Sequence, residues 1–420
     1  MKIAVWHNLP SGGGKRGLYY HVRGLVERGH EVSCWCLDTA DQSFLPLSEF
    51  VPEHVVPTVS KKPRGGLTSW LAPRYSEAVA RMQEFDEACR RCAQEIAAGQ
   101  FDLLFANSAV GYNVPFVLRH LRMKKALYLQ EPRRFLYEAA PILPWVSTAP
   151  EDPGSSLFNP RKILANYPNL QTLRLQAKQE WLNVHACDRV LVNSYFSRES
   201  VLRAYGVEAR VCYLGVDTTL FRNLHLERER FIVGVGALDR IKHIDLAIKA
   251  VALLPEPRPP LVWIANSGNE AYRNEMTELA RLLRVDLRIE MAISDDELVT
   301  KLNKAALLLC TSRLEPFGFA PLEANACGLP VVGIAEGGIR ETILDGVNGF
   351  LVNPDPESIA RAAQSLLLDA GLAMRLGKTA ADYVQRQWDV EESVSRLETI
   401  LLQVASAEPN RPESEGKRKE

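Results

Sequence analysis

The chain has 420 residues, which is length for two or three domains at roughly 150 residues each and for a large core without disulfides. Hydrophobic residues make up 46% and charged residues 24%, and 50 Lys and Arg against 51 Asp and Glu leave a formal charge of -1. This composition is typical of a globular enzyme. It excludes a bulk polycation, so we expect no nucleic-acid partner.

Short apolar runs alternate with longer helical patterns, which predicts an α/β fold of parallel strands joined by crossover helices. Each half of the chain restarts with a strand and a glycine-containing loop, so two open sheets fit better than one barrel. Strands are expected at residues 3–7, 31–37, 103–106, 125–130 and 189–193, and then at 230–235, 260–265, 286–290, 306–311 and 330–334. Helices are expected between them, for example at 244–254 and 295–303.

The turn-rich segment 213–222 marks the predicted domain boundary. Residues 141–169 are rich in Pro, Ser and Asn, which predicts a long and partly irregular insertion. We therefore expect four parts, which are an N-terminal domain (1–213), a C-terminal domain (214–387), a C-terminal helix (388–406) and a disordered tail (407–420).

The eight cysteines are spread among apolar segments, which indicates a reducing, cytoplasmic setting instead of a disulfide framework. Cys89 and Cys92 have metal or redox spacing, but no second Cys or His pair follows, so we interpret them as one face of a helix. No apolar run reaches the ~18 residues of a membrane span, and the first strand leads into a polar loop instead of a signal peptide. We expect a cytoplasmic protein, with any membrane contact peripheral at the inner face.

The first predicted strand leads into the glycine-rich segment 11–16, followed by a helix expected near Leu18. Glycines at such a turn allow backbone N–H groups to approach a phosphate at the positive end of the helix. The pattern G-x-G-x-x-G is met from Gly12 to Gly17, whereas Leu9 excludes a Walker A loop. The segment alone favours a diphosphate near the helix start, and a tight turn without a ligand is the alternative.

Two glutamates, Glu315 and Glu323, flank the sequence Pro-Phe-Gly-Phe-Ala-Pro-Leu after a predicted strand. This spacing places one carboxylate in a loop and the other on the first turn of the next helix, so that one site can face both. An ordinary acid near a helix N-terminus would explain Glu323. It would not explain the Pro-Phe-Gly beside Glu315.

Together these motifs resemble the retaining family 4 glycosyltransferases. The resemblance covers nearly the whole chain except residues 40–100, the 141–169 insertion and the tail. It implies a GT-B fold, in which two Rossmann-like domains face each other across a cleft, and a last helix (388–406) that returns to the N-terminal domain. The motifs that carry it, besides the first glycines and the glutamate pair, are VNS at 192–194, LGVD at 214–217, VGALDRIK at 235–242 and EGGIRE to GVNGF at 336–350.

The resemblance also implies roles for individual residues in binding a nucleoside diphosphate (NDP) sugar. Glu323 would accept hydrogen bonds from the ribose hydroxyls. The two catalytic residues would be Glu315, which would contact the transferred sugar, and Lys242, which would neutralise the leaving diphosphate. Backbone N–H groups would contact the sugar and the diphosphate at Gly12, Gly13, Phe317, Gly318 and Phe319.

Two positions depart from the family pattern. Ala237 stands where the family commonly has Arg; we include Arg240 among the donor-binding residues, and whether it replaces that Arg stays open. The family also tends to carry a His near the strand end that here reads Phe-Ala-Asn-Ser, and neither Asn107 nor Ser108 is a good base. On the acceptor side we expect polar contacts from Asn107, Gln130, Glu131 and Arg133.

The predicted reaction is metal-independent transfer of a hexosyl group from an NDP-sugar to a glycan or lipid-linked acceptor, by front-face attack with retention. The chain lacks the metal-binding motif Asp-x-Asp, so we expect no metal and no other cofactor. Basic clusters near residues 61–64, 119–125 and 133–134 can hold an anionic acceptor or rest on anionic lipid, or can be solvated helix faces. The alternatives are a nucleotide-sugar epimerase or hydrolase on the same fold and a non-catalytic sugar-nucleotide-binding protein.

Overall fold

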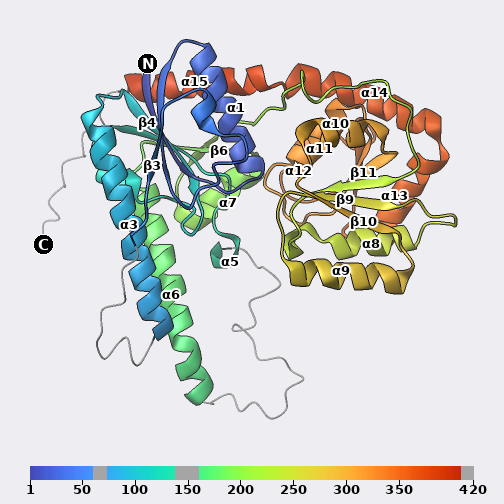
Figure 1. Ribbon diagram of the computed structural model, residues 1–420, viewed down its shortest axis with the longest axis horizontal. Coiled ribbons are helices and arrows are strands. Elements are labelled where there is room, and N and C mark those ends of the chain that lie inside the picture. Colours follow the sequence, from blue (N-terminus) through green and yellow to red (C-terminus); the bar gives the residue numbers. More distant parts are fainter. Residues whose placement is uncertain (60–72, 138–159, 408–420) are drawn as a thin grey trace, which may run out of the picture.

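The computed structural model describes residues 1–59, 73–137 and 160–407. Within these residues the chain forms two Rossmann-like α/β domains that face each other (Figure 1), each built on a parallel sheet flanked by helices. The strand orders are β3-β2-β1-β4-β5-β6-β7 in the N-terminal sheet and β10-β9-β8-β11-β12-β13 in the C-terminal sheet. The predicted two-sheet architecture is therefore confirmed.

In the N-terminal domain, β1 pairs with both β2 and β4, so the strand order reverses beside β1, where open α/β sheets bind their ligands. The strands are β1 (Lys2–Asn8), β2 (Glu31–Leu37), β3 (Glu53–Val56), β4 (Leu103–Ala109), β5 (Lys124–Tyr128), β6 (Arg189–Val192) and β7 (Ala209–Val211). The helices are α1 (Gly13–Glu27), the short η1 (Leu47–Glu49), α3 (Pro73–Ala98), α4 (Val117–His120), α5 (Arg134–Tyr137), α6 (Pro160–Val184) and α7 (Tyr195–Tyr205).

In the C-terminal domain, β8 pairs with β9 and β11 in the same way. The strands are β8 (Ile232–Val235), β9 (Leu261–Ala265), β10 (Leu287–Met291), β11 (Leu307–Cys310), β12 (Val331–Ile334) and β13 (Gly349–Val352). The helices up to α13 are η2 (Arg240–Lys242), α8 (Ile244–Ala252), α9 (Glu270–Leu283), α10 (Asp295–Lys304), α11 (Phe319–Ala326), α12 (Ile339–Thr342) and α13 (Pro356–Leu368).

Local sequence explains these elements. The central strands β9 and β11 are continuous apolar runs buried along their whole length, as expected for parallel strands covered on both faces. Helix α10 begins with a capping box, in which the Ser294 hydroxyl accepts from the Glu297 N–H and the Glu297 carboxylate accepts from the Ser294 N–H. These signals lie within a few residues of each other, and the sequence predicted these elements to within one or two residues.

Some predictions differ from the structure. Helix α1 begins at Gly13, earlier than the predicted start near Leu18, because Gly12 adopts a φ of 137° that turns the chain directly into the helix. The short strands β3, β7 and β13 were missed, since each is only partly buried and lacks the continuous apolar run that marks the central strands. The insertion expected to be partly irregular is helical from residue 160 onward, with Pro168 inside α6. Residues 141–159 of that insertion, the predicted basic cluster at 61–64 and residues 408–420 of the predicted tail lie outside the described residues.

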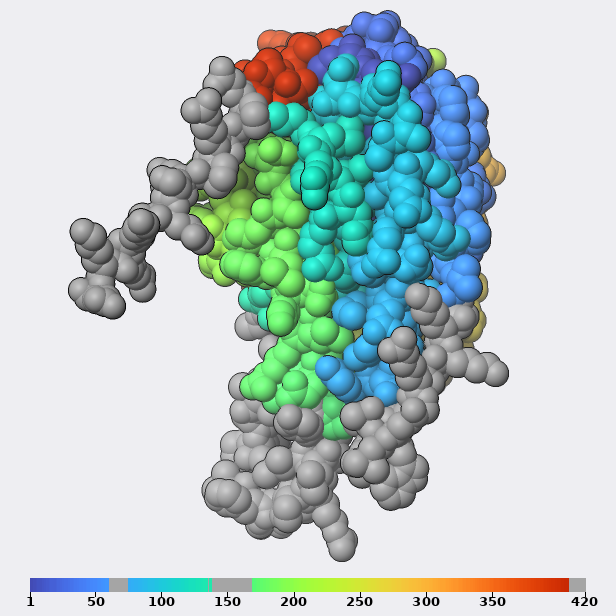
Figure 2. All heavy atoms as spheres, turned by 90° about the vertical axis from the view of Figure 1, so that its left-hand side faces the viewer, coloured from blue at the N-terminus to red at the C-terminus, as the bar shows by residue number. Residues whose placement is uncertain are grey.

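Cys89 and Cys92 are both buried on α3 and are free thiols, packed against the N-terminal core. The helix-face interpretation is thus confirmed. Helix α3 lies beside α6, and the two extend together away from the sheet (Figures 1 and 2). None of the helices in the described residues combines the length and the apolar character needed to cross a bilayer.

The chain crosses between the domains twice, and the two crossing segments are joined. Helix α14 (Ala370–Gln387) packs on α11 and α13, whereas α15 (Val390–Ser406) lies on α1, β4 and β5 of the N-terminal domain (Figure 1). The Val216 N–H donates to the Trp388 carbonyl at 2.8 Å, and the Val390 N–H donates to the Val216 carbonyl at 3.0 Å. The crossings therefore run side by side and form a short hinge.

Gly215 is required at this hinge, because a Cβ there would lie 2.6 Å from the Asp389 carbonyl oxygen. We expect Gly215→Ala to lower the free energy of unfolding by about 2 kcal/mol, the scale of overpacking in a tight contact. Gly371→Ala is the matched control, since its Cβ would meet only side-chain ends at 3.2 Å or more, and it should shift stability by less than about 0.5 kcal/mol. Thermal unfolding compares the variants, and equal effects would contradict the steric argument.

Candidate active site

A cavity of about 670 Å³ lies between the two domains. Its N-terminal wall includes the glycine loop at 11–14 and Gln130 after β5, and its C-terminal wall includes residues 235–237 after β8 and 315–321 after β11. The carboxyl ends of parallel strands thus meet at this cavity from both sides, which is where open α/β sheets bind ligands. We take this cavity as the candidate active site.

The glycine loop brings the start of α1 close to the opposite domain. A Cβ on Gly13 would lie 3.0 Å from Cδ2 of Phe319, so Gly13 allows the N-terminus of α1 to approach the N-terminus of α11. Helix α11 is itself preceded by Gly318, whose φ of 103° favours glycine. Two helix N-termini, with their unsatisfied N–H groups and positive dipole ends, therefore border one cavity. Gly12 and Phe317 line it as well.

Lys242 and Glu315 form an ion pair in this cavity, with Lys242 Nζ 2.6 Å from Glu315 Oε2. Lys242 ends the short helix η2 after β8, and its carbonyl accepts a hydrogen bond from the Thr311 hydroxyl at 2.9 Å. Glu315 lies in the loop after β11, and its carbonyl accepts from the Gly338 N–H at 2.7 Å. A Cβ on Gly338 would lie 2.1 Å from the Pro316 carbonyl, so the glycines of the EGGIRE motif hold the Glu315 loop.

The ion pair keeps both side chains charged. Burial would raise the pKa of Glu315, but the nearby Lys242 and Arg134 charges outweigh it and lower that pKa. Burial would likewise lower the pKa of Lys242, but Glu315 raises it. The site therefore holds a preorganised ammonium group at neutral pH.

Glu323, on α11, also lines the cavity and is 5% exposed. Its Oε1 lies 3.4 Å from Nε of Arg16, which comes from α1 of the other domain. Arg16 is held in addition by Asp295 at the start of α10, with bonds of 3.0 and 2.6 Å to its two carboxylate oxygens. Burial raises the pKa of Glu323 in spite of the Arg16 charge. Arg16 is therefore a site residue that the sequence motifs did not predict.

Two further contacts join the domains near the cavity. The Ser194 hydroxyl, which caps α7, donates to the Pro316 carbonyl at 2.6 Å. The Glu341 carboxylate accepts from the N–H groups of Tyr195 and Phe196 at 2.9 and 3.0 Å and from the Tyr213 hydroxyl at 2.8 Å. A carboxylate from one domain thus satisfies the helix N-terminus of the other, which explains both the VNS and the EGGIRE motifs.

Arg240 does not lie in the cavity. Its guanidinium pairs with Glu275 at 2.6 Å on α9 and lies over the Tyr272 ring, whereas Ala237 and Lys242 line the cavity. Both cations are on η2, where successive residues of a 3₁₀ turn point about 120° apart, so residues two apart face different ways. Sequence spacing alone did not reveal this difference.

Of the four residues predicted on the acceptor side, two line the cavity and two do not. Gln130 and Glu131 line the cavity, and Asn193 Nδ2 donates to Gln130 Oε1 at 3.0 Å. Asn107 is 2% exposed on β4 and Arg133 bonds the Gly111 carbonyl, so neither lines the cavity.

The arginine that lines the cavity at this end of the N-terminal domain is Arg134, the neighbour of the predicted Arg133. An adjacent pair of arginines gives no sequence signal for which of the two faces inward.

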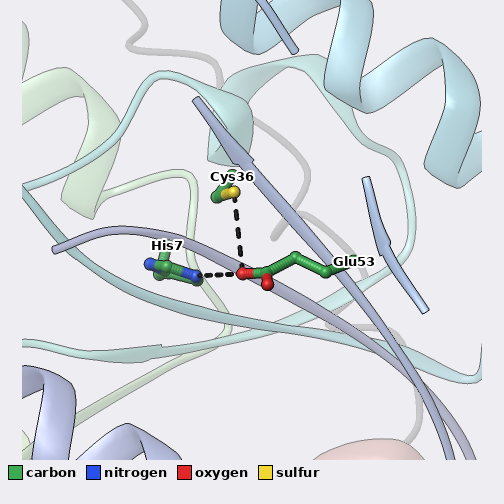
Figure 3. A group of neighbouring side chains, drawn as sticks. All are labelled: His7, Cys36 and Glu53. Atoms are coloured by element: carbon green, nitrogen blue, oxygen red, sulfur yellow. Dashed lines mark hydrogen bonds and ion pairs between the residues drawn. The ribbon is translucent and has the colours of Figure 1, made fainter. Parts of the chain in front are cut away.

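His7, Cys36 and Glu53 point toward one another at the ends of the N-terminal strands (Figure 3), with ligand atoms within 4.8 Å of each other. This spacing suits a metal ion, but Lys15 Nζ lies 3.5 Å from His7 Nε2 and already supplies a positive charge. Burial also raises the pKa of the Cys36 thiol to about 12, which disfavours the thiolate that a metal needs. We interpret the cluster as a buried polar network that anchors the start of α1.

The sequence matches two known families. Residues 11–220, which are 210 of the 420, match the family described as Glycosyltransferase Family 4. Residues 216–383 match the family described as Glycosyl transferases group 1. The chain therefore belongs to glycosyltransferase family 4, as the sequence motifs predicted.

Several curated proteins are similar to this chain in sequence. The chain is 30% identical over 230 residues to D-inositol 3-phosphate glycosyltransferase of Acidothermus cellulolyticus, covering 49% of this chain and 51% of that protein. It is 27% identical over 406 residues to the protein of the same name from Salinispora tropica, covering 88% and 76%. The N-acetyl-alpha-D-glucosaminyl L-malate synthase of Bacillus anthracis is 29% identical over 185 residues, covering 44% and 48%. The chain thus spans about half the length of the first and third of these relatives.

Solved structures share the fold over nearly the whole chain. Sucrose-phosphate synthase of Thermosynechococcus elongatus has a TM-score of 0.70 and 21% identity, covering 97% of this chain and 100% of that one. HepE of Anabaena, solved in complex with UDP and glucose, has a TM-score of 0.68 and 19% identity, covering 96% and 100%. The GT-B fold is confirmed.

Glu315 and Glu323 should give opposite pH dependences of stability, because folding lowers the pKa of Glu315 and raises that of Glu323. A carboxyl with a lowered pKa stabilises the fold above its unfolded pKa of about 4.3 and loses this contribution as pH falls through the folded pKa. A carboxyl with a raised pKa contributes stability at low pH and loses it as pH rises through the folded pKa.

We therefore expect Glu315→Gln to lower the free energy of unfolding by about 2 kcal/mol at neutral pH, between the values for exposed and buried ion pairs, because Lys242 is left partly buried without its partner. This deficit should shrink as pH falls toward about 4. Glu323→Gln is the matched control: it should cost little at neutral pH, since Arg16 keeps Asp295, and should not show this shrinking deficit. Urea denaturation at several pH values measures both, and a pH-independent deficit for Glu315→Gln would contradict the assignment.

Proposed function

We propose that the protein is a retaining glycosyltransferase that moves a hexosyl group from an NDP-sugar to a glycan or lipid-linked acceptor without a metal ion. The observation that carries this proposal is that the Lys242–Glu315 pair and Glu323 line one cavity between two Rossmann-like domains. Family membership supports transfer of a sugar. HepE, a structural neighbour, is solved with UDP-glucose, which supports a nucleotide-sugar donor.

In this proposal the C-terminal domain holds the donor. Glu323 accepts hydrogen bonds from the ribose hydroxyls, and Glu315 bonds hydroxyls of the transferred sugar. Lys242 contacts the diphosphate, where a compact ammonium charge is most effective. The N-termini of α1 and α11 add N–H groups around the phosphates, since Gly12, Gly13 and Gly318 leave room for close approach.

The chemical step is front-face attack. The acceptor oxygen bonds the anomeric carbon on the face that the diphosphate leaves, and the acceptor proton passes to the departing phosphate oxygen. The bond between the anomeric carbon and that oxygen breaks, so configuration is retained and no protein base is required. The protein supplies charge stabilisation and geometry, for which Lys242 is already charged and held by Glu315.

The acceptor enters from the N-terminal side of the cavity in this proposal. Gln130 and Glu131 line that side and can bond acceptor hydroxyls. The curated relatives named for inositol 3-phosphate are compatible with a polyhydroxylated acceptor. We assign Asn107 and Arg133 no direct contact, since they do not line the cavity.

Lys242→Met should lower kcat for transfer by about 10²- to 10³-fold, because the leaving diphosphate loses its ammonium partner. Arg240→Met is the matched control, since this exposed cation pairs with Glu275 away from the cavity, and it should change kcat by less than about twofold. Initial rates with a radiolabelled donor measure both variants. Equal losses would contradict the assignment of Lys242.

Wild-type protein should transfer sugar from at least one member of a panel of UDP-, GDP- and ADP-sugars, and EDTA should change the rate by less than about twofold. The same panel without acceptor tests hydrolysis, and calorimetry tests binding without turnover. Full dependence on added Mg²⁺ would contradict the metal-free mechanism. Hydrolysis or epimerisation alone, or binding without turnover, would contradict the transferase assignment.

A further inference from the structure

The cavity lacks a cation at the position where the family commonly places an arginine beside the lysine. That position is Ala237, which lines the cavity, while Arg240 is turned toward Glu275 on the outer face. A donor diphosphate would therefore meet Lys242 as the only cation that the C-terminal residues lining the cavity contribute. Among the described residues, the opposite wall contributes two arginines, Arg16 and Arg134.

Arg134 is placed against the loop that carries Glu315. Its NH1 donates to the Arg313 carbonyl at 3.1 Å, two residues before Glu315 and across the domain boundary. Its Nε bonds Glu131 Oε2 at 2.5 Å within its own domain. Burial is the largest influence on the pKa of both Lys242 and Glu315, and the Arg134 charge contributes to the lowered pKa of Glu315 and opposes the raised pKa of Lys242. The guanidinium thus acts on the same electrostatic site as the ion pair.

Arg16 is less suited to a phosphate. Its guanidinium is already held by two carboxylates, Asp295 and Glu323, and is 6% exposed. The Arg134 side chain is 18% exposed at the cavity wall, against 7% for the Arg16 side chain. A carboxylate and a backbone carbonyl orient the fork of Arg134 and can yield to a doubly charged diphosphate, which binds guanidinium groups in bidentate fashion.

We propose that Arg134 of the N-terminal domain is the second cation for the donor diphosphate and replaces the arginine that is absent at Ala237. This inference rests on the proposed function. The diphosphate would lie between Lys242 of one domain and Arg134 of the other. Neutralisation of the leaving group would then require the closed arrangement of the two domains, which Arg134 itself joins through the Arg313 carbonyl.

The test compares Arg134→Met, Ala237→Arg and the double variant with Arg240→Met as control. We expect Arg134→Met to lower kcat/KM for the donor by about 10²-fold, the scale for one charge-stabilising donor. Ala237→Arg should restore at least about tenfold of that loss in the double variant, because it supplies a cation to the same cavity from the opposite wall. If Arg134 had only a structural role, a cation introduced on the other domain would not restore activity.

Binding measurements with nucleotides test whether Arg134 acts on the diphosphate. Among UDP, GDP and ADP, the diphosphate that binds wild type most tightly is titrated calorimetrically, together with its monophosphate. Arg134→Met should weaken binding of the diphosphate about tenfold or more and leave the monophosphate nearly unchanged, since the lost contact is to the terminal phosphate.

Three outcomes would overturn the inference. Arg134→Met could leave donor kcat/KM and diphosphate affinity unchanged while Lys242→Met is impaired. It could raise only the KM for the acceptor, which would make Arg134 an acceptor contact. Ala237→Arg could fail to restore activity in a double variant that unfolds like wild type. Absence of nucleotide binding and turnover in wild type is a separate result, which would instead overturn the proposed function.

Discussion

Buried charges in the interdomain cavity have to be neutralised in pairs, and the rest of the site follows from this constraint. A carboxylate removed from water without a cation is costly, so Glu315 depends on Lys242, and Glu323 depends on Arg16. The two pairs differ in which domains supply their members. Lys242 and Glu315 belong to one domain and hold a ready ammonium group, whereas Arg16 reaches Glu323 from the other domain.

The same electrostatic logic joins the domains beyond the cavity. Glu341 satisfies the N-terminus of α7, and Ser194 bonds the Pro316 carbonyl beside Glu315. Each bond uses a group that would otherwise be an unsatisfied helix terminus or loop carbonyl. Relative domain position and the position of Glu315 are therefore set by shared contacts, while the paired crossing segments at Val216 leave a hinge of few bonds.

Local sequence predicted most strands, the α10 cap and the helix face of Cys89, because these depend on periodicity and on residues a few positions apart. It also predicted that Glu315 and Glu323 would reach one cavity, since a loop and the helix that follows it leave little freedom. Local sequence did not show that Arg240 faces away from the cavity. It also did not show that Arg134, and not Arg133, lines the cavity. In both cases neighbouring cations point to different surroundings, and only packing against α9 or against the Arg313 loop decides which one faces the cavity.

The amino-acid order alone determined two glycine-started α/β halves, the family to which they belong and the acids and lysine of the C-terminal half. These features are encoded by contacts within a single supersecondary unit. The tertiary structure decided which cations serve the cavity, that Arg16 pairs with Glu323 and Asp295, and that Arg134 approaches the Lys242–Glu315 pair. Such contacts join residues more than a hundred positions apart on different domains, and their partners are set by how two complete sheets face each other.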